Sequence, residues 1–235
     1  MNMKTVLSVC IGLSLLFAPA CDDGKIYDEH TSVVREGGAV SLTGSLHGVD
    51  SWPGGYSIVL AGFAGTNEYA QTAQGITPEA DGSVSMTLQG IPAEVTRVEV
   101  CAINKLRKRI ATFYAVDYEE TADTLRLDMG TVNARMYGAI QSGVFDRSCT
   151  ACHGGSTKPA AGLYLTEGKS HAALVGVVAD RSADSLLLVN PGNASASFLH
   201  VMLQENVLRY DHTQIITSAN TLQLIDDWID NGANE

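Results

Sequence analysis

Short runs of apolar residues, most of them alternating with polar ones, fill the chain from about residue 39 to residue 132. Alternation with a period of two puts every second side chain on one face of a strand, so these runs predict half-buried strands. Glycine-rich turns, among them Asp81-Gly82, separate the runs. The runs cover residues 40–46, 56–63, 84–88, 95–101, 110–118 and 124–129. This spacing predicts an all-β sandwich over residues 39–132.

The sandwich region is similar to the Ig-like or transthyretin-like modules of surface lipoproteins. A basic cluster, Lys105-Leu-Arg-Lys-Arg109, falls between two of the predicted strands. We expect it to form a hairpin tip, and the alternative is a docking patch for an acidic redox partner. Cys101, in the strand before it, has no unassigned cysteine to pair with, so we expect a buried, inert thiol.

The pattern of apolar residues changes from strand-like to helical spacing after Ala134. The segment 135–145 places Met136, Ile140 and Val144 on one helical face. The segment 218–229 repeats apolar residues at helical spacing beside Trp228, and Asn231-Gly232 predicts its end. Residues 133–235 are therefore expected to form a helical domain.

This half contains Cys149-Thr-Ala-Cys152-His153, a Cys-x-x-Cys-His sequence, which is the attachment signature of c-type haem. Two thiols at this spacing add to the two vinyl groups of one porphyrin, and the histidine that follows becomes the proximal iron ligand. The alternatives are a thiol-disulfide site and half of a zinc site. The first expects a βαβ setting, and the second expects a further ligand pair that the cysteines do not supply.

Four separated segments, beginning at Val144, Ala161, Val189 and Leu224, occur in the order found in a family of bacterial monohaem cytochrome c domains, which residues 135–235 therefore resemble. The resemblance implies two domains, an all-β sandwich followed by an all-α cytochrome c-like domain. It also implies that the helix before the haem motif packs against the final helix, with the haem between them.

The resemblance also bears on the distal iron ligand. Family members commonly place Met-Pro ahead of the last helix, and no Met-Pro follows Cys152. The family's usual spacing, counted back from Trp228, points to His212 instead, which implies bis-histidine coordination and a low potential. Met202, His200 and an open distal site are the alternatives. We expect His171 to be exposed on a helix, and His30 and His47 to be at the surface. Phe145, Leu163 and Trp228 are candidates to line the haem pocket.

Residues 1–20 have the pattern of a secretory signal peptide: Lys4, an apolar run and a small-residue ending. The run is too short for the roughly 20 residues that a bilayer span needs. Cys21 follows directly, as in the lipobox of bacterial lipoproteins, which implies a lipidated N-terminus and a tether over residues 21–38. The alternative is ordinary cleavage, which would leave a soluble periplasmic protein.

A net charge of −11 argues against nucleic acid as a partner, because phosphate binding needs a basic surface. We therefore expect a lipid-anchored carrier of single electrons at the cell envelope, with one covalent haem c, an unidentified redox partner protein and no enzymatic activity. The alternative is a surface adhesion lipoprotein whose haem domain is a sensor or a structural module. A haem peroxidase would need an open sixth position and an acid-base group, for which the sequence offers no candidate.

Overall fold

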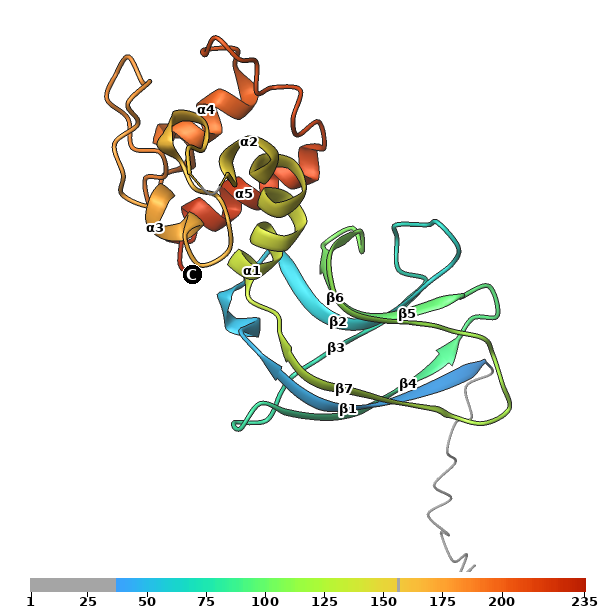
Figure 1. Ribbon diagram of the computed structural model, residues 1–235. Coiled ribbons are helices and arrows are strands. Elements are labelled where there is room, and N and C mark those ends of the chain that lie inside the picture. Colours follow the sequence, from blue (N-terminus) through green and yellow to red (C-terminus); the bar gives the residue numbers. More distant parts are fainter. Residues whose placement is uncertain (1–36, 156) are drawn as a thin grey trace, which may run out of the picture. The chain divides into compact units, whose positions relative to one another are not determined.

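The computed structural model describes residues 37–155 and 157–235 (Figure 1). The predicted signal peptide, the lipidated Cys21, His30 and the tether as far as residue 36 lie outside these residues. The strands are β1 (Gly38–His47), β2 (Tyr56–Phe63), β3 (Thr72–Gly75), β4 (Ser83–Ile91), β5 (Arg97–Asn104), β6 (Arg109–Asp117) and β7 (Leu125–Asn133). The helices are α1 (Met136–Ile140), α2 (Thr150–His153), α3 (Ser170–Leu174), α4 (Phe198–Gln204) and α5 (Ala219–Asp230), with a π-helix over Gln141–Cys149.

The strands form two sheets that pack face to face. One has the order β4-β1-β7, with β1 antiparallel to β4 and parallel to β7. The other is antiparallel and has the order β3-β2-β5-β6. Inward side chains of both sheets, such as Val40 and Leu42 of β1 and Val98 and Val100 of β5, share one buried core. The six expected strands are confirmed, and β3 is an additional strand.

Strands β2 and β5 are apolar on both faces because a second, smaller cluster lies on the other side of their sheet. Val59, Phe63, Cys101 and Ile103 belong to it, and Ala70 of the β2–β3 connection packs there. A strand buried on both sides reads as a continuous apolar run, which explains why residues 58–63 lack alternation. The expectation of a buried Cys101 is confirmed, and burial raises the pKa of its thiol.

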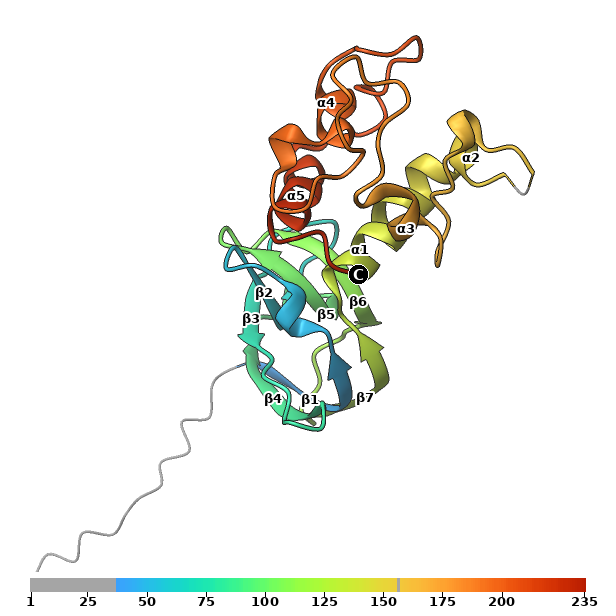
Figure 2. The same ribbon diagram turned by 90° about the vertical axis from the view of Figure 1, so that its left-hand side faces the viewer.

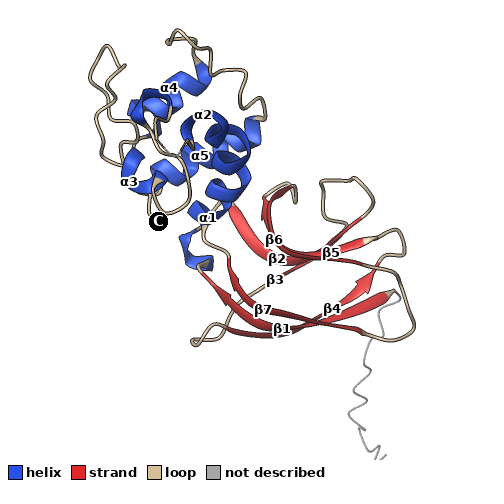
Figure 3. Ribbon diagram, in the orientation of Figure 1, coloured by secondary structure: helices blue, strands red, loops and turns tan. Residues whose placement is uncertain are grey.

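The predicted fold class is wrong for the second half of the chain. The structure is mixed, with 26% of residues helical and 32% in strands, and the described part of the chain has no distinct all-α cytochrome domain. The described residues form one compact unit, and helices alternate with loops after β7 (Figure 3). Isolated bridges such as Val175–Val189 and Val178–Leu187 occur among the loops. Glycine, proline, serine and aspartate recur between residues 154 and 197, and these residues favour turns over long helices.

Specific contacts join the helices to the sheets, which is why no separate helical domain forms. The indole nitrogen of Trp52 donates to the carbonyl of Ala134 at 2.6 Å. The hydroxyl of Tyr56, at the start of β2, donates to Asp227 of α5, also at 2.6 Å. Trp52 and Ile110 pack against both the sheet core and the helical core. Figure 2 shows α1 and α5 at the ends of β2 and β6.

None of the helices in the described parts of the chain is both long enough and apolar enough to cross a membrane.

Candidate haem site

One continuous helical stretch carries the chain from the end of the sheets to the Cys-x-x-Cys-His motif. It consists of α1, the π-helix and α2. The buried residues repeat at intervals of four: Met136, Ile140 and Val144 form one series and Tyr137, Gln141 and Phe145 another. The expected helix over residues 135–145 is thus confirmed and extends further. π-Helical turns are rare and are frequently found at functional sites, and this one ends at the first of the two cysteines.

A buried polar network fixes this stretch against the rest of the helical half. The amide nitrogen of Gln141 donates to Asp146 at 2.7 Å and to the carbonyl of Leu165 at 3.0 Å. Its amide oxygen accepts from the hydroxyl of Ser170. Ser170 also contacts the hydroxyl of Tyr137 at 2.5 Å. Each polar group therefore has a partner, which makes the burial of Gln141 tolerable and the position of the helix specific.

Cys149 and Cys152 lie one helical turn apart, at the end of the π-helix and in α2. Residues three apart on a helix share a face, so both thiols can reach one planar group. Both are free thiols; Cys152 is exposed, whereas Cys149 is half-buried and packs against the helical core. Burial, and then the nearby Cys152, raise the pKa of Cys149 to about 11.

A hydrogen bond from its imidazole ring to the backbone orients His153. Its Nδ1 donates to the carbonyl of Ala160, 3.1 Å away, because a carbonyl can only accept. Nε2 is then the unprotonated nitrogen, which is the atom that binds a metal. Burial is the main cause that lowers the pKa of His153, so the neutral ligand form is favoured.

His212 lies close to His153, although the two residues are 59 positions apart in the sequence. Its Nδ1 donates to the carbonyl of Tyr210 at 2.9 Å, which again leaves Nε2 free. The two ring centroids are 6.4 Å apart and the ring planes differ by 33°. Metal–imidazole bonds are about 2.0–2.1 Å long and the ring centre lies about 1.1 Å behind the nitrogen, so two imidazoles on opposite sides of one metal ion have centroids about 6.3 Å apart. The observed centroid distance therefore matches the distance expected for two imidazoles that bind one metal ion.

The alternative distal ligands have other contacts. His200 of α4 binds Asp226 through Nδ1 at 2.8 Å, and Gln204 contacts the same ring. Met202 is half-buried against the helical core. Of the candidate distal histidines, His212 is the one whose ring forms a described pair with the ring of His153.

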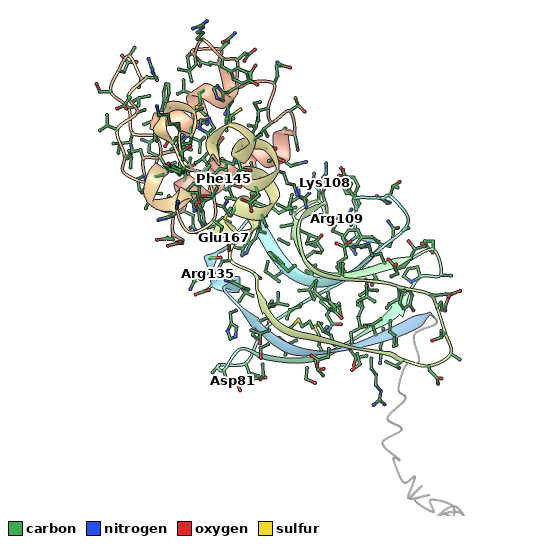
Figure 4. The ribbon with its side chains drawn as sticks, viewed as in Figure 1. Asp81, Lys108, Arg109, Arg135, Phe145 and Glu167 are labelled. Carbon is green, nitrogen blue, oxygen red and sulfur yellow. The ribbon has the colours of Figure 1, made fainter. Side chains whose placement is uncertain are left out.

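Phe145, Leu163 and Trp228, the expected pocket residues, all belong to or pack against the helical core that Cys149 also contacts. Phe145 and Trp228 are almost fully buried, and Phe145 lies among the helices in Figure 4. Tyr137 of α1 stands between them, 6.3 Å from Phe145 and 5.1 Å from Trp228 between ring centroids. Helices α1 and α5 are thus in direct contact, which confirms that the helix before the haem motif packs against the final helix. The position of the haem stays a prediction.

The remaining sequence candidates lie away from the histidine pair. His47 is exposed, as expected. His171 lies on a helix, α3, as expected, but it is half-buried instead of exposed, and its Nε2 donates to the carbonyl of Ala233 at 2.7 Å. The cluster at residues 105–109 forms the turn between β5 and β6, as expected. Lys108 pairs there with Glu68 at 3.1 Å and Arg109 with the buried Glu99 at 2.6 Å (Figure 4).

Sequence reasoning missed the two groups that orient the histidines, the carbonyls of Ala160 and Tyr210. A backbone carbonyl carries no residue signature, so the sequence holds no signal for them. Zinc would need three or four of these side chains around one ion. The described residues contain no such group of three or more His, Cys, Asp or Glu side chains.

The chain matches no protein-family model, no curated protein and no solved structure.

Proposed function

We propose that the protein is a c-type haem protein that carries single electrons. Cys149 and Cys152 would bind the porphyrin covalently, His153 would be the proximal ligand and His212 the distal ligand. The observation that carries the proposal is the 6.4 Å spacing of two imidazoles that both keep Nε2 free. A haem held in this way supplies reversible one-electron chemistry.

The residues of the chain set the conditions for that chemistry. Two imidazole ligands favour ferric iron more than an imidazole and a thioether do, so we propose a low midpoint potential. The carbonyls of Ala160 and Tyr210 each accept a hydrogen bond from a ligand ring, which orients the ring and makes it a stronger donor. Phe145, Leu163 and Trp228 would limit the access of water to the porphyrin.

The proposed membrane anchor, cellular location and partner rest on the sequence alone. We propose a lipid anchor at Cys21, a place at the cell envelope and a redox protein as partner. The net charge of −11 disfavours nucleic acid as a partner and is compatible with a basic partner surface.

The test is expression of the full chain together with a haem-maturation system, followed by a pyridine haemochrome spectrum of the purified protein. We expect one covalent haem per chain, lost in a Cys149→Ala/Cys152→Ala double variant. A protein without covalent haem would overturn the proposal.

The distal ligand is tested in the same preparation. His212→Ala should convert low-spin ferric haem to high-spin haem, whereas Met202→Leu and His200→Ala should leave the spectrum unchanged. The ferric charge-transfer band typical of methionine ligation, or an unaltered spectrum of His212→Ala, would assign the distal position to another residue.

A further inference from the structure

His212 lies in a segment without regular secondary structure between α4 and α5, residues 206–214, here named the distal strap. Val207 and Tyr210 in this strap are 46% and 59% exposed, whereas Leu203 before it and Ile216 after it are buried. The strap is therefore anchored to the helical core at its two ends.

The hydrogen bonds of the distal strap are local. The side chain of Asp211 accepts from the backbone nitrogen of Thr213 at 2.9 Å and from its hydroxyl at 2.7 Å, which closes a tight turn around His212. The backbone nitrogen of Ile215 donates to the carbonyl of His212 at 3.0 Å. Among the described residues, each hydrogen bond made by residues 207–214 has its partner within residues 205–215.

Tyr210 completes the turn. Its carbonyl accepts from Nδ1 of His212, and its ring lies edge-on to the imidazole, with 5.1 Å between centroids. The direction of the imidazole therefore depends on the path of the backbone from residue 210 to residue 213, and Asp211 is the side chain that fixes this path.

We propose that Asp211 is a positioning residue for the distal ligand. By closing the turn on Thr213 it holds His212 opposite His153 in a strap whose hydrogen bonds are internal. This inference rests on the proposed function. It implies that opening the turn releases His212 without unfolding the rest of the chain, because the hydrogen bonds that are lost do not connect the strap to the core.

The experiment compares Asp211→Ala with Asp211→Asn in the haem-loaded protein. Alanine removes both bonds to Thr213, whereas the side-chain oxygen of asparagine can still accept both. For Asp211→Ala we expect partial conversion to high-spin haem and a rate of carbon monoxide binding to the reduced protein about fivefold to tenfold higher, the scale set by the loss of exposed hydrogen bonds. Asp211→Asn should behave like the unaltered protein.

Two controls separate positioning from general destabilisation. Thr213→Val removes only the hydroxyl donor and should lie between the unaltered protein and Asp211→Ala. Asp184→Ala, an exposed carboxylate in another loop, should have no effect. The melting temperature should be the same in all four variants. A melting temperature lowered in Asp211→Ala together with unchanged spin state would indicate a structural role and overturn the proposal.

A second readout does not need haem. In the chain expressed without haem maturation, nitrogen chemical shifts should show His212 as the Nδ1-protonated tautomer, because Tyr210 accepts from that nitrogen. Asp211→Ala should mix the two tautomers, and an unchanged tautomer would overturn the positioning role. A chain that never binds haem would instead refute the proposed function and leave this measurement valid.

Discussion

At the scale of single residues, the contact between Tyr56 and Asp227 joins β2 to α5. Burial, followed by the hydrogen bond and the negative charge of Asp227, raises the pKa of Tyr56. A phenol with a raised pKa in the folded state stabilises the fold below the pKa of an unfolded tyrosine, about 10, and loses that contribution as the pH rises through the folded value.

Tyr56→Phe should therefore lower the free energy of unfolding by about 1.5–3 kcal/mol at neutral pH, the range for hydrogen bonds to charged groups. The difference between the two proteins should shrink above about pH 10, because the unaltered protein then loses stability that the variant lacks. Urea unfolding from pH 7 to pH 11 measures this. Tyr114→Phe, whose hydroxyl makes no described hydrogen bond, is the control, and a difference that grows with pH would contradict the account.

At the scale of elements, β1 depends on a glycine where its register with β7 shifts. Gly44 has a φ of +140°, and a Cβ there would lie 2.6 Å from the carbonyl oxygen of Gly130 and 2.6 Å from Cγ of Met129. The register between β1 and β7 shifts between Thr43 and Ser45, at this glycine. A close approach of two backbones and a left-handed conformation both exclude a side chain.

Gly44→Ala should lower the free energy of unfolding by about 3 kcal/mol or more, since backbone strain and overpacking each cost about 1–3 kcal/mol. Gly130→Asn is the matched control, because Gly130 has a positive φ of 61° but open space around a Cβ. It should cost less than about 1 kcal/mol, since asparagine tolerates this conformation. Equal losses in denaturant unfolding would show that the contact with Gly130 does not matter.

At the scale of the whole molecule, the helices and the sheets share side chains and hydrogen bonds. Trp52 donates a hydrogen bond to Ala134, and Tyr56 donates one to Asp227. The hydroxyl of Ser51 accepts from the backbone nitrogen of Met136 at 2.9 Å. The sheet core and the helical core are bridged by Trp52 and Ile110, and parts of a protein that are linked in this way open as one cooperative unit. We therefore expect the most protected amides of β2 and of α5 to exchange with the same free energy of opening.

Native-state hydrogen exchange in the haem-free chain measures this directly. Trp52→Leu removes the bond to Ala134 and the aromatic contacts with Tyr56 and Phe113, so it should separate the two values. Helical amides that already exchange at a lower free energy in the unaltered chain would show that the halves are independent.

Local patterns in the sequence determined where the strands and the end of the final helix lie, and the Cys-x-x-Cys-His motif identified the candidate site. Six strands follow from short apolar runs, most of which alternate with a period near two and one of which, in β2, is continuous. The end of α5 follows from Asn231 and Gly232, whose φ is +96°. The turn at residues 105–109 lies where the charges predict it. These features depend on neighbouring residues, so one segment of sequence contains the information. Strand β3 was not predicted, because it is only four residues long and largely polar.

Only the tertiary structure decided how the halves combine and which groups orient His153 and His212. The hydrogen bonds from Trp52 to Ala134 and from Tyr56 to Asp227 span 82 and 171 residues. They connect the β-rich and the helical parts of the chain, whose different sequence patterns predicted separate domains. The proximity of His153 and His212, 59 positions apart in the sequence, also depends on contacts in space. The resemblance pointed to His212, but the distance between its ring and that of His153, and the hydrogen bonds to the carbonyls of Ala160 and Tyr210, are decided by the tertiary structure. The contacts between the halves and between the two histidines join residues far apart in the sequence, so no local pattern of residues predicts them.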